Sequence, residues 1–413
     1  MFKHDIIIQK YGGTSVGSPE RIKAVAQRVA QSAKLYKHVV VVVSAMGDTT
    51  DDLIGLAKTM SSSPSSREYD QLISTGENIS ASLLAIGLQE IGVPAISLTG
   101  PQAGVKTENI YSRAKILRVD TGRIKCELSE GQVVVVAGFQ GATENGDVAT
   151  IGRGGSDTSA VVLAAALGAE ECEIYTDVDG VYTTDPRLIS DATKLTEISY
   201  DEMLELASLG AKVLHPRSVE CAKENQIILH VRSSFSQEEG TRVKEDSQME
   251  IQRAVTGITL NQEEAKIAIL KVPDQPGIAG KLFTRLADVN INVDMIIQSV
   301  EQDHINNITF TVNVDDLAQA AAITQSVADE LGAKGVVTDD NIAKLSIVGV
   351  GMISKAGIAA QMFEVLGAKG INIQLISTSE IKISCVIEKQ FAKEALVLLH
   401  SAFELDQKIG SPS

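Results

Sequence analysis

Two nearly unbroken valine runs constrain the fold of this 413-residue chain more than any other feature. They cover residues 39–43 and 133–136, and segments with helical patterns lie between them. A strand whose side chains are all apolar must be buried on both faces, as in a parallel sheet covered by helices. Apolar residues recur at helical spacing in the intervening segments, as at Ile22, Val25 and Val29. The first 235 residues therefore predict an α/β sandwich with a mostly parallel sheet.

An internal repeat follows a polar stretch at 236–252, which we interpret as a domain boundary. Residues 277–283 match 357–363, and 291–293 match 371–373, a period of about 80 residues. Each copy has the pattern of a ferredoxin-like βαββαβ unit. A purely structural duplication would give the same pattern.

The second copy of the repeat is one strand short. The expected strands lie near 266–272, 291–299, 305–314 and 334–338 in the first copy, and near 344–350, 371–377 and 381–388 in the second. Proteins avoid an exposed sheet edge, so we expect the β-rich segment 254–260 to pair into the second copy. The predicted domains are 1–245, 265–340 and 342–413, the last completed by 254–260.

Composition excludes several classes of protein. The net charge of −16 disfavours a nucleic-acid coat or a protein that binds anionic membranes. No apolar run approaches the roughly 20 residues that span a bilayer, and the first residues lack a signal-peptide pattern. The four cysteines are far apart, which is typical of reduced thiols rather than a disulfide framework or a zinc site. We expect a cytoplasmic protein with no nucleic-acid or membrane partner and no dedicated metal site.

A lysine followed by paired glycines stands at the first strand-to-helix turn. Lys10 precedes Gly12 and Gly13, and the segment ends at Gly17 before a helix. Glycines let backbone N–H groups approach an anion, and a helix N-terminus adds positive potential. In the common P-loop the lysine follows the glycines, so this order indicates a different kinase scaffold. A plain glycine turn with a surface lysine is the alternative.

Two further segments place polar groups at strand or helix ends. Hydroxyl residues between Ser44 and Thr50 follow the first valine run, where ligands bind in open α/β sheets. Glu77 opens the next helix. Each has a plain alternative: the hydroxyls could only cap a helix, and Glu77 could be a first-turn acid rather than a partner for a substrate ammonium.

An arginine among glycines is the second strong signal. Arg153 lies in Gly-Arg-Gly-Gly at 152–155, and Asp157 follows at a helix start. A guanidinium binds a carboxylate through two hydrogen bonds, whereas Asp157 could simply cap the helix. The polar loop at 176–187 is long for a turn and would suit a nucleotide pocket. Lys212 would supply a second cation there.

Together these segments resemble the aspartate kinases of the amino-acid kinase family. The matching strings are 10–17, 43–45, 75–77, 152–157, 176–187 and 210–216. The repeat resembles the paired ACT regulatory domains of the same enzymes. The likeness therefore spans nearly the whole chain, and it implies a monofunctional member without a homoserine dehydrogenase half.

The resemblance implies a reaction. Aspartate kinases transfer the γ-phosphoryl group of ATP, with Mg²⁺, to the β-carboxylate of L-aspartate. The product, 4-phospho-L-aspartate, leads to threonine, methionine and, through diaminopimelate, lysine. A carboxylate with a pKa of about 4 is already ionised at neutral pH and needs no general base. Catalysis then rests on positioning and on charge neutralisation at the γ-phosphate.

The resemblance also implies roles for individual residues. The catalytic pair is Lys10 and Asp157. The aspartate-binding residues are Ser44, Thr50, Glu77 and Arg153. The ATP-binding residues are Lys10, Gly12, Gly13, Ser15, Thr176, Asp177, Tyr182, Asp185, Arg187 and Lys212.

Regulation is expected at the repeat, by lysine, by threonine or by both. The turn at 274–278 opens a helix whose amides suit an amino-acid carboxylate. The expected effector residues are Asp274, Gly277, Ile278 and Gln298, with Ser354 and Asn372 in a second or diverged site. Paired ACT domains imply a homo-oligomer, and Met249 could start a shorter regulatory subunit.

Two alternatives remain open at this point. A kinase acting on glutamate or acetylglutamate would share the glycine loops, although it would not be expected to carry the repeat. An amino-acid sensor without activity would share the repeat but would have no reason to retain Lys10 and Arg153. An ACT-bearing dehydrogenase is disfavoured because no G-x-G-x-x-G follows a strand.

Overall fold

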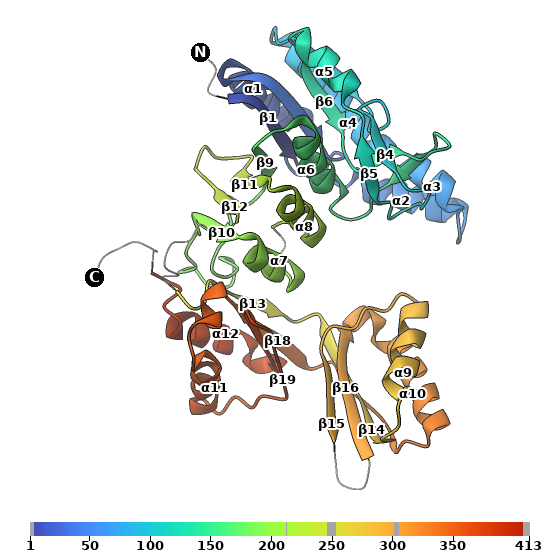
Figure 1. Ribbon diagram of the computed structural model, residues 1–413, viewed down its shortest axis with the longest axis vertical. Coiled ribbons are helices and arrows are strands. Elements are labelled where there is room, and N and C mark those ends of the chain that lie inside the picture. The colour runs from blue at the N-terminus through green and yellow to red at the C-terminus, as the bar shows by residue number, and fades with distance from the viewer. Residues whose placement is uncertain (1–3, 212, 246–252, 301–304, 408–413) are drawn as a thin grey trace. The chain divides into compact units, whose positions relative to one another are not determined.

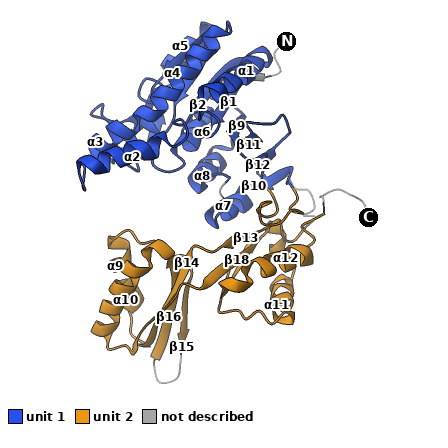
Figure 2. Cartoon of the chain, turned by 180° about the vertical axis from the view of Figure 1, so that it is seen from behind, with its two compact units in different colours: residues 1–181, 194–249 blue, residues 182–193, 250–413 orange. Residues whose placement is uncertain are grey.

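The computed structural model describes residues 4–211, 213–245, 253–300 and 305–407 (Figure 1). They belong to two compact units (Figure 2). Unit 1 comprises 1–181 and 194–249, and unit 2 comprises 182–193 and 250–413. Among the described helices, none is long and apolar enough to cross a membrane.

Unit 1 contains the following helices and strands. The strands are β1 (His4–Tyr11), β2 (Tyr36–Val43), β3 (Ala95–Leu98), β4 (Val105–Thr107), β5 (Ile116–Val119), β6 (Val133–Ala137), β7 (Gln140–Ala142), β8 (Val148–Thr150), β9 (Glu171–Thr176), β10 (Glu197–Ser199), β11 (Ile228–Ser233) and β12 (Thr241–Lys244). The helices are α1 (Pro19–Leu35), α2 (Thr49–Met60), α3 (Ser66–Ile73), α4 (Thr75–Glu90), α5 (Gly122–Ser129), α6 (Gly155–Leu167), α7 (Tyr200–Ser208) and α8 (Pro216–Asn225).

An eight-stranded sheet organises unit 1, with the order β10-β12-β11-β9-β1-β2-β6-β3. Its neighbouring strands are parallel except for the antiparallel pair β11 and β12. A second sheet, β5-β4-β7-β8, lies in the same unit. The predicted α/β fold with a mostly parallel sheet is confirmed.

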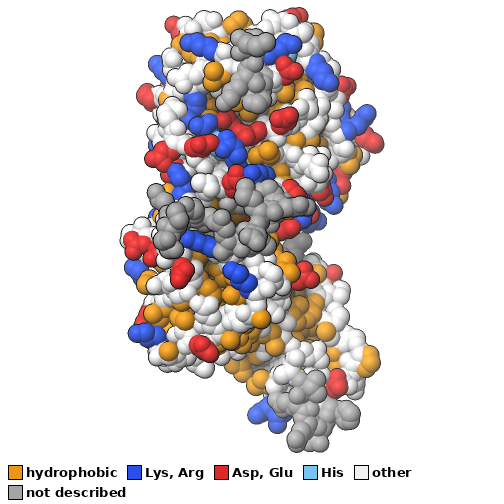
Figure 3. All heavy atoms as spheres, turned by 60° about the vertical axis from the view of Figure 1, so that its left-hand side comes forward, with side chains coloured by type: hydrophobic (Ala, Val, Ile, Leu, Met, Phe, Trp, Pro, Cys, Tyr) orange, Lys and Arg blue, Asp and Glu red, His pale blue; other side chains and the backbone are white. Residues whose placement is uncertain are grey.

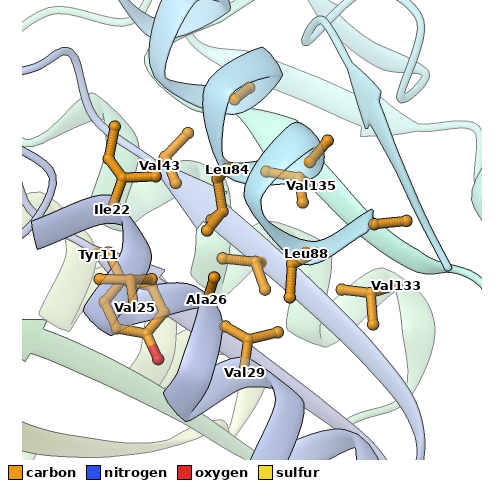
Figure 4. Close-up of a cluster of buried hydrophobic side chains, with 14 of the residues drawn as sticks. Tyr11, Ile22, Val25, Ala26, Val29, Val43, Leu84, Leu88, Val133 and Val135 are labelled. Carbon is orange, nitrogen blue, oxygen red and sulfur yellow. The ribbon is translucent and has the colours of Figure 1, made fainter. Parts of the chain in front are cut away.

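One face of the large sheet packs against α1 and α4 (Figure 4). In the valine strands β2 and β6, odd-numbered side chains such as Val41 and Val135 pack there with Val29 and Leu84. The even-numbered valines are equally buried and must face the other side, because side chains alternate along a strand. Helix α6 contacts β1, β2 and β9. Helices on both faces explain why residues 39–43 of β2 and 133–136 of β6 are all valine, whereas Lys37 and His38 lie at the less buried start of β2.

Unit 2 contains two four-stranded antiparallel sheets flanked by helices. Its strands are β13 (Gly257–Asn261), β14 (Glu264–Pro273), β15 (Ile296–Val300), β16 (Ile305–Asn313), β17 (Gly335–Asp339), β18 (Ile342–Val348), β19 (Leu375–Thr378) and β20 (Lys382–Glu388). Its helices are α9 (Ile278–Asp288), α10 (Leu317–Leu331), α11 (Ile358–Ala368) and α12 (Ala392–Ala402), with short 3-10 turns η1 (Val314–Asp316), η2 (Val350–Ile353) and η3 (Lys389–Phe391). The sheet orders are β15-β16-β14-β17 and β13-β18-β20-β19.

The segment expected to complete the second repeat is β13, which pairs antiparallel with β18. Ile258 lies in the hydrophobic core with Leu345, Leu396 and Leu399 of the second repeat. The second strand of each repeat is shorter than predicted, since it begins at Ile296 and Leu375. Ile291 and Ile371 are buried by packing against their helices, and their N–H groups bond to helix carbonyls instead of a ladder.

The units divide at 249/250, within the polar stretch 236–252, but one further segment differs from the predicted domains. Residues 182–193 belong to unit 2, although they fall inside the predicted kinase domain 1–245. Ile189 packs into the core of the second repeat, and the Thr183 carbonyl accepts the N–H of Ile258 at 2.7 Å. The Thr183 hydroxyl also lies 3.0 Å from Nε2 of His400.

Charges of both signs are interspersed over the face of the molecule drawn in Figure 3. Acidic residues outnumber basic ones, 53 to 37, in the whole sequence. The basic side chains at the site described below therefore belong to a protein whose net charge is negative.

Candidate active site

Three parallel strands of unit 1 end together. Tyr11 in β1 is the register partner of Val43 in β2 and of Tyr175 in β9. The N–H of Gly12 donates to the Tyr175 carbonyl at 3.2 Å, and the N–H of Ser44 donates to the Tyr11 carbonyl at 3.1 Å. Ligands of open α/β sheets bind outside the carboxyl ends of the strands. This edge is therefore the expected position of the site.

A buried ion pair lies at this edge. The ammonium of Lys10, a residue only 8% exposed, is 2.6 Å from Oδ1 of Asp157 in the first turn of α6. The N-cap of α6 is Gly154, and Asp157 lies within the first turn with its carboxylate directed to Lys10. The pair brings together the two residues predicted to be catalytic.

The paired glycines leave room around Lys10. A Cβ atom at Gly12 would lie 3.4 Å from Lys10 Nζ, and one at Gly13 would lie 3.0 Å from the Ala45 carbonyl oxygen. The N–H of Gly47 donates to the Gly13 carbonyl at 3.1 Å. The glycine loop therefore packs tightly against the turn after β2 at Gly13, whereas a Cβ at Gly12 would make only an ordinary contact with Lys10.

Ser15 supports the glycine loop from inside. Its side chain is buried, and its Oγ lies 2.5 Å from Oγ of Ser234 at the end of β11. Its N–H donates to the Gly12 carbonyl at 2.9 Å. Ser234 was not among the predicted site residues, although it follows a strand directly, as Ser44 does.

Glu77 in α4 is a buried carboxylate with one unused oxygen. Its Oε1 accepts the N–H of Ala45 at 3.1 Å, whereas Oε2 is buried without a hydrogen-bond partner among the described residues. Burial raises the pKa of Glu77 to about 7, although the hydrogen bond from Ala45 opposes this shift. A cation placed at Oε2 would satisfy the carboxylate.

The hydroxyl residues near Glu77 come from the turn after β2. Ser44 is partly buried, and its carbonyl accepts the hydroxyl of Ser80 at 2.6 Å. Thr50 lies in the first turn of α2 and is partly buried. Hydrogen bonds between α4 and the turn after β2 thus hold both the backbone of Ser44 and the side chain of Glu77.

Residues 151–155, here called the Arg153 turn, connect β8 to α6. Gly152 and Gly154 have φ angles of +86° and +70°, which favour glycine. A Cβ at Gly154 would lie 2.3 Å from the His215 side chain, so no other residue fits there. The Arg153 side chain is exposed, as expected for a group that binds a ligand.

The predicted nucleotide residues fall into both units. Thr176 and Asp177 lie at the end of β9 in unit 1, and the Thr176 hydroxyl donates to Asp177 at 3.0 Å. Tyr182, Asp185 and Arg187 lie in unit 2, where Arg187 forms an ion pair with Asp185 at 2.7 Å. Lys212, like Met249, lies outside the described residues.

One group of potential metal ligands lies in the large sheet. Among the described residues, the side chains close enough together to share a metal ion are those of Glu171, Glu173 and His230. Arg232 pairs with Glu173 at 2.8 Å, and Arg242 pairs with Glu171 at 3.3 Å. The negative charge of both carboxylates is already balanced, so this group does not suit a divalent cation.

The predicted effector turn lies at the start of α9 in unit 2. Gly277 caps the helix with a φ of +92°, Ile278 is its first residue, and Asp274 accepts a hydrogen bond from Asn306 at 2.9 Å. Gln298 is exposed on β15. The second repeat has the same glycine at 357, with φ +95°, while Ser354 and Asn372 are exposed nearby in the chain.

Comparisons with known proteins agree with this architecture. Residues 5–233 match the Amino acid kinase family, and residues 266–331 and 345–403 each match the ACT domain. The sheet, the glycine loop with its lysine, and these matches define a kinase of the amino acid kinase class.

Relatives narrow the class further. An aspartokinase from Bacillus sp. (strain MGA3) is 52% identical over 97% of both chains, and one from Thermus thermophilus is 50% identical over 97% of this chain and 99% of its own. The chain belongs to the aspartokinase family and is a phosphotransferase.

Solved structures of relatives share the fold. Aspartokinase III of E. coli, solved with aspartate and ADP, has a TM-score of 0.80 and 26% identity over 97% of this chain and 100% of its own. Aspartate kinase from Synechocystis is 48% identical, with a TM-score of 0.55 over 99% of this chain and 71% of its own.

Removing the charge of Glu77 should stabilise the ligand-free protein at alkaline pH. Between pH 4.5 and about 7 the folded state holds a proton on Glu77 that the unfolded state has lost, so stability falls as pH rises. Glu77→Gln should raise the free energy of unfolding by up to about 3 kcal/mol above pH 7.

The gain should shrink as pH falls and vanish below pH 4.5, where both states are protonated. Unfolding of both proteins at pH 5 and pH 8 measures this difference, with the exposed Glu90→Gln as control. An equal effect at both pH values would contradict the buried charge.

Proposed function

We propose that the chain transfers the γ-phosphoryl group of ATP to the β-carboxylate of L-aspartate, giving 4-phospho-L-aspartate and ADP. The observation that carries the proposal is the buried Lys10–Asp157 pair beside the paired glycines at the strand ends. The E. coli relative was solved with aspartate and ADP, which supports the same pair of ligands here.

Lys10 would stabilise the charge that develops during transfer. The aspartate carboxylate oxygen forms a bond to the γ-phosphorus while the bond to the bridging oxygen breaks, and ADP leaves. The nucleophile is already ionised, so no side chain needs to remove a proton. Negative charge on the transferring phosphoryl group is what a preorganised ammonium stabilises. Asp157 would fix the direction of that ammonium.

The substrate contacts follow from complementary charge. The buried and unpaired Oε2 of Glu77 would receive the ammonium of aspartate. Arg153 is exposed and presents a guanidinium that suits the α-carboxylate. Ser44 and Thr50 would add hydrogen bonds from the turn after β2. His215 near Arg153 accepts the N–H of Arg217 as a helix cap, so it is not assigned as a base.

In unit 1, ATP would be bound by Gly12, Gly13, Ser15, Thr176 and Asp177, together with Lys212. Tyr182, Asp185 and Arg187, which the resemblance also implies for ATP binding, belong to unit 2. Mg²⁺ bound to its phosphates would neutralise part of their charge. The only metal-ligand group found among the described residues is already paired with arginines. This fits a metal that is held by the nucleotide phosphates rather than by a set of protein ligands.

We further propose feedback control at the ACT repeats by lysine, threonine or both. The E. coli relative was also solved with lysine and aspartate. The product would then feed the synthesis of lysine, by diaminopimelate, and of threonine and methionine in the cytoplasm. The proposal includes a homo-oligomer that forms through the ACT repeats, together with a shorter subunit that starts at Met249.

Replacing Lys10 should reduce turnover strongly. Lys10→Ala removes the ammonium beside the glycine loop, and kcat should fall about a hundredfold or more, as when an electrostatic stabiliser is lost. A coupled assay for ADP with aspartate measures this rate. The exposed Lys34→Ala is the control, and near wild-type turnover in Lys10→Ala would refute the assignment.

Replacing Arg153 should affect one substrate more than the other. Arg153→Lys keeps the charge but loses the two-pronged hydrogen bond, so KM for aspartate should rise about tenfold or more while KM for ATP changes much less. Steady-state kinetics with each substrate varied in turn gives both constants. Arg118→Lys, an exposed change on β5, is the control. A larger rise in KM for ATP would place Arg153 in the nucleotide site.

Effector titration tests the regulatory proposal. Millimolar lysine, threonine or the two together should inhibit the wild-type enzyme, because their carboxylates would bind the amides at the start of α9. Asp274→Ala should require more effector for the same inhibition, unlike the exposed Asp288→Ala at the end of the same helix. Full activity of the wild type with both amino acids present would remove the regulatory role.

A further inference from the structure

Asp70 is a fully buried carboxylate to which the mechanism above gives no role. It lies in α3, and its oxygens accept three hydrogen bonds from segments distant in sequence. A buried carboxylate is costly unless its hydrogen bonds are satisfied, so these contacts require explanation. They lead towards the Arg153 turn.

The three hydrogen bonds join two backbone segments. Oδ2 of Asp70 accepts the N–H of Ser112 at 2.8 Å and the N–H of Thr150 at 2.6 Å. Oδ1 accepts the hydroxyl of Ser112 at 3.0 Å. Ser112 has a φ of +66°, an uncommon conformation for a residue other than glycine. Thr150 ends β8 and directly precedes the Arg153 turn.

Arg217 in α8 holds the same two segments from another side. Its guanidinium donates to the carbonyl of Ile151 at 2.6 Å and to the carbonyl of Ala114 at 2.8 Å. The N–H of Ala114 in turn donates to the Thr150 carbonyl at 2.9 Å. Asp70 therefore fixes an N–H group before the turn, and Arg217 fixes the first carbonyl within it.

The Arg153 turn needs support from its neighbours. Arg153 stands between two glycines, Gly152 and Gly154, which restrict the backbone less than any other residue. A Cβ at Gly152 would lie only 3.1 Å from the Ser112 carbonyl oxygen, so the turn rests against the segment that Asp70 holds. The direction of the exposed Arg153 side chain depends on this backbone.

We propose that Asp70 and Arg217 are positioning residues for the transfer reaction, which hold the Arg153 turn so that its guanidinium meets the substrate carboxylate. The inference rests on the proposed role of Arg153. A displacement of about 1 Å in a substrate-binding group can cost on the order of a hundredfold in rate. Neither residue needs to touch the substrate.

Conservative variants test the positioning role. Asp70→Asn keeps the size of the side chain but turns an amide N–H₂ towards a backbone or hydroxyl donor. Arg217→Lys keeps the charge but cannot reach both carbonyls in the same way. Each should raise KM for aspartate about tenfold or more, while KM for ATP stays within about twofold. Equal changes in both constants would show a general structural defect and overturn the proposal.

A double-mutant cycle with Arg153→Ala separates positioning from an independent effect. Asp70→Asn and Arg217→Lys should change kcat/KM for aspartate by less than about twofold when Arg153 is absent, because they act through it. If the two substitutions lower kcat/KM for aspartate as much in the Arg153→Ala protein as in the protein that retains Arg153, the proposal is overturned. Unchanged KM for aspartate in Arg153→Ala alone would refute the role of Arg153 itself, and the inference with it.

Folding is checked separately. Far-UV circular dichroism and the thermal midpoint of each variant are compared with Glu127→Gln, which alters another buried carboxylate that pairs with Arg123 and Gln132. Glu127→Gln should leave the ratio of the two KM values unchanged. If Asp70→Asn fails to fold, Arg217→Lys and its cycle decide the question alone. A shifted KM ratio in Glu127→Gln would show that any buried carboxylate has this effect and would overturn the proposal.

Discussion

Burial of the central strands on both faces is the constraint on which unit 1 depends. Because helices cover the valine strands β2 and β6 on either side, polar side chains have little place along them. Polar and charged groups are left to the strand ends and to the turns that follow. Parallel pairing brings several such ends to one edge, so a site assembled from distant segments is a consequence of the packing.

The buried ionisable groups of unit 1 differ in how far the protein itself satisfies them. Lys10 and Asp157 balance each other, and Asp70 is satisfied by three hydrogen bonds. Glu77 is satisfied on one oxygen only, and its raised pKa reflects the cost of its burial. A buried carboxylate oxygen without a partner is costly, so Glu77 is the group of this set that a ligand cation would stabilise most, whereas Asp70 already accepts its hydrogen bonds and Asp157 already pairs with Lys10.

Local strings made much of the site predictable. Lys10, Ser44 and Arg153 each stand where a strand ends or a helix begins, and glycines or hydroxyls beside them mark the turn. Asp70 carries no such mark, Arg217 only follows the proline that opens α8, and Ser234, directly after β11, carries the mark that identified Ser44. Their partners lie 80, 66 and 219 residues away, so the contacts exist only once the fold brings the segments together. The strand count predicted a missing edge in the second repeat, whereas it did not predict that the second strands begin late.

The two units cannot be separated by cleaving the chain at one position, because unit 2 includes a segment that lies within the sequence of unit 1. Residues 182–193 leave the kinase unit, pack through Ile189 into the core of the second repeat, and then return. A chain that ended after the kinase domain would contain residues 182–193 but would lack the core of the second repeat, into which Ile189 packs. Loss of unit 2 would therefore also remove this core, so that a kinase unit made alone would contain a segment with no partner for its apolar side chain.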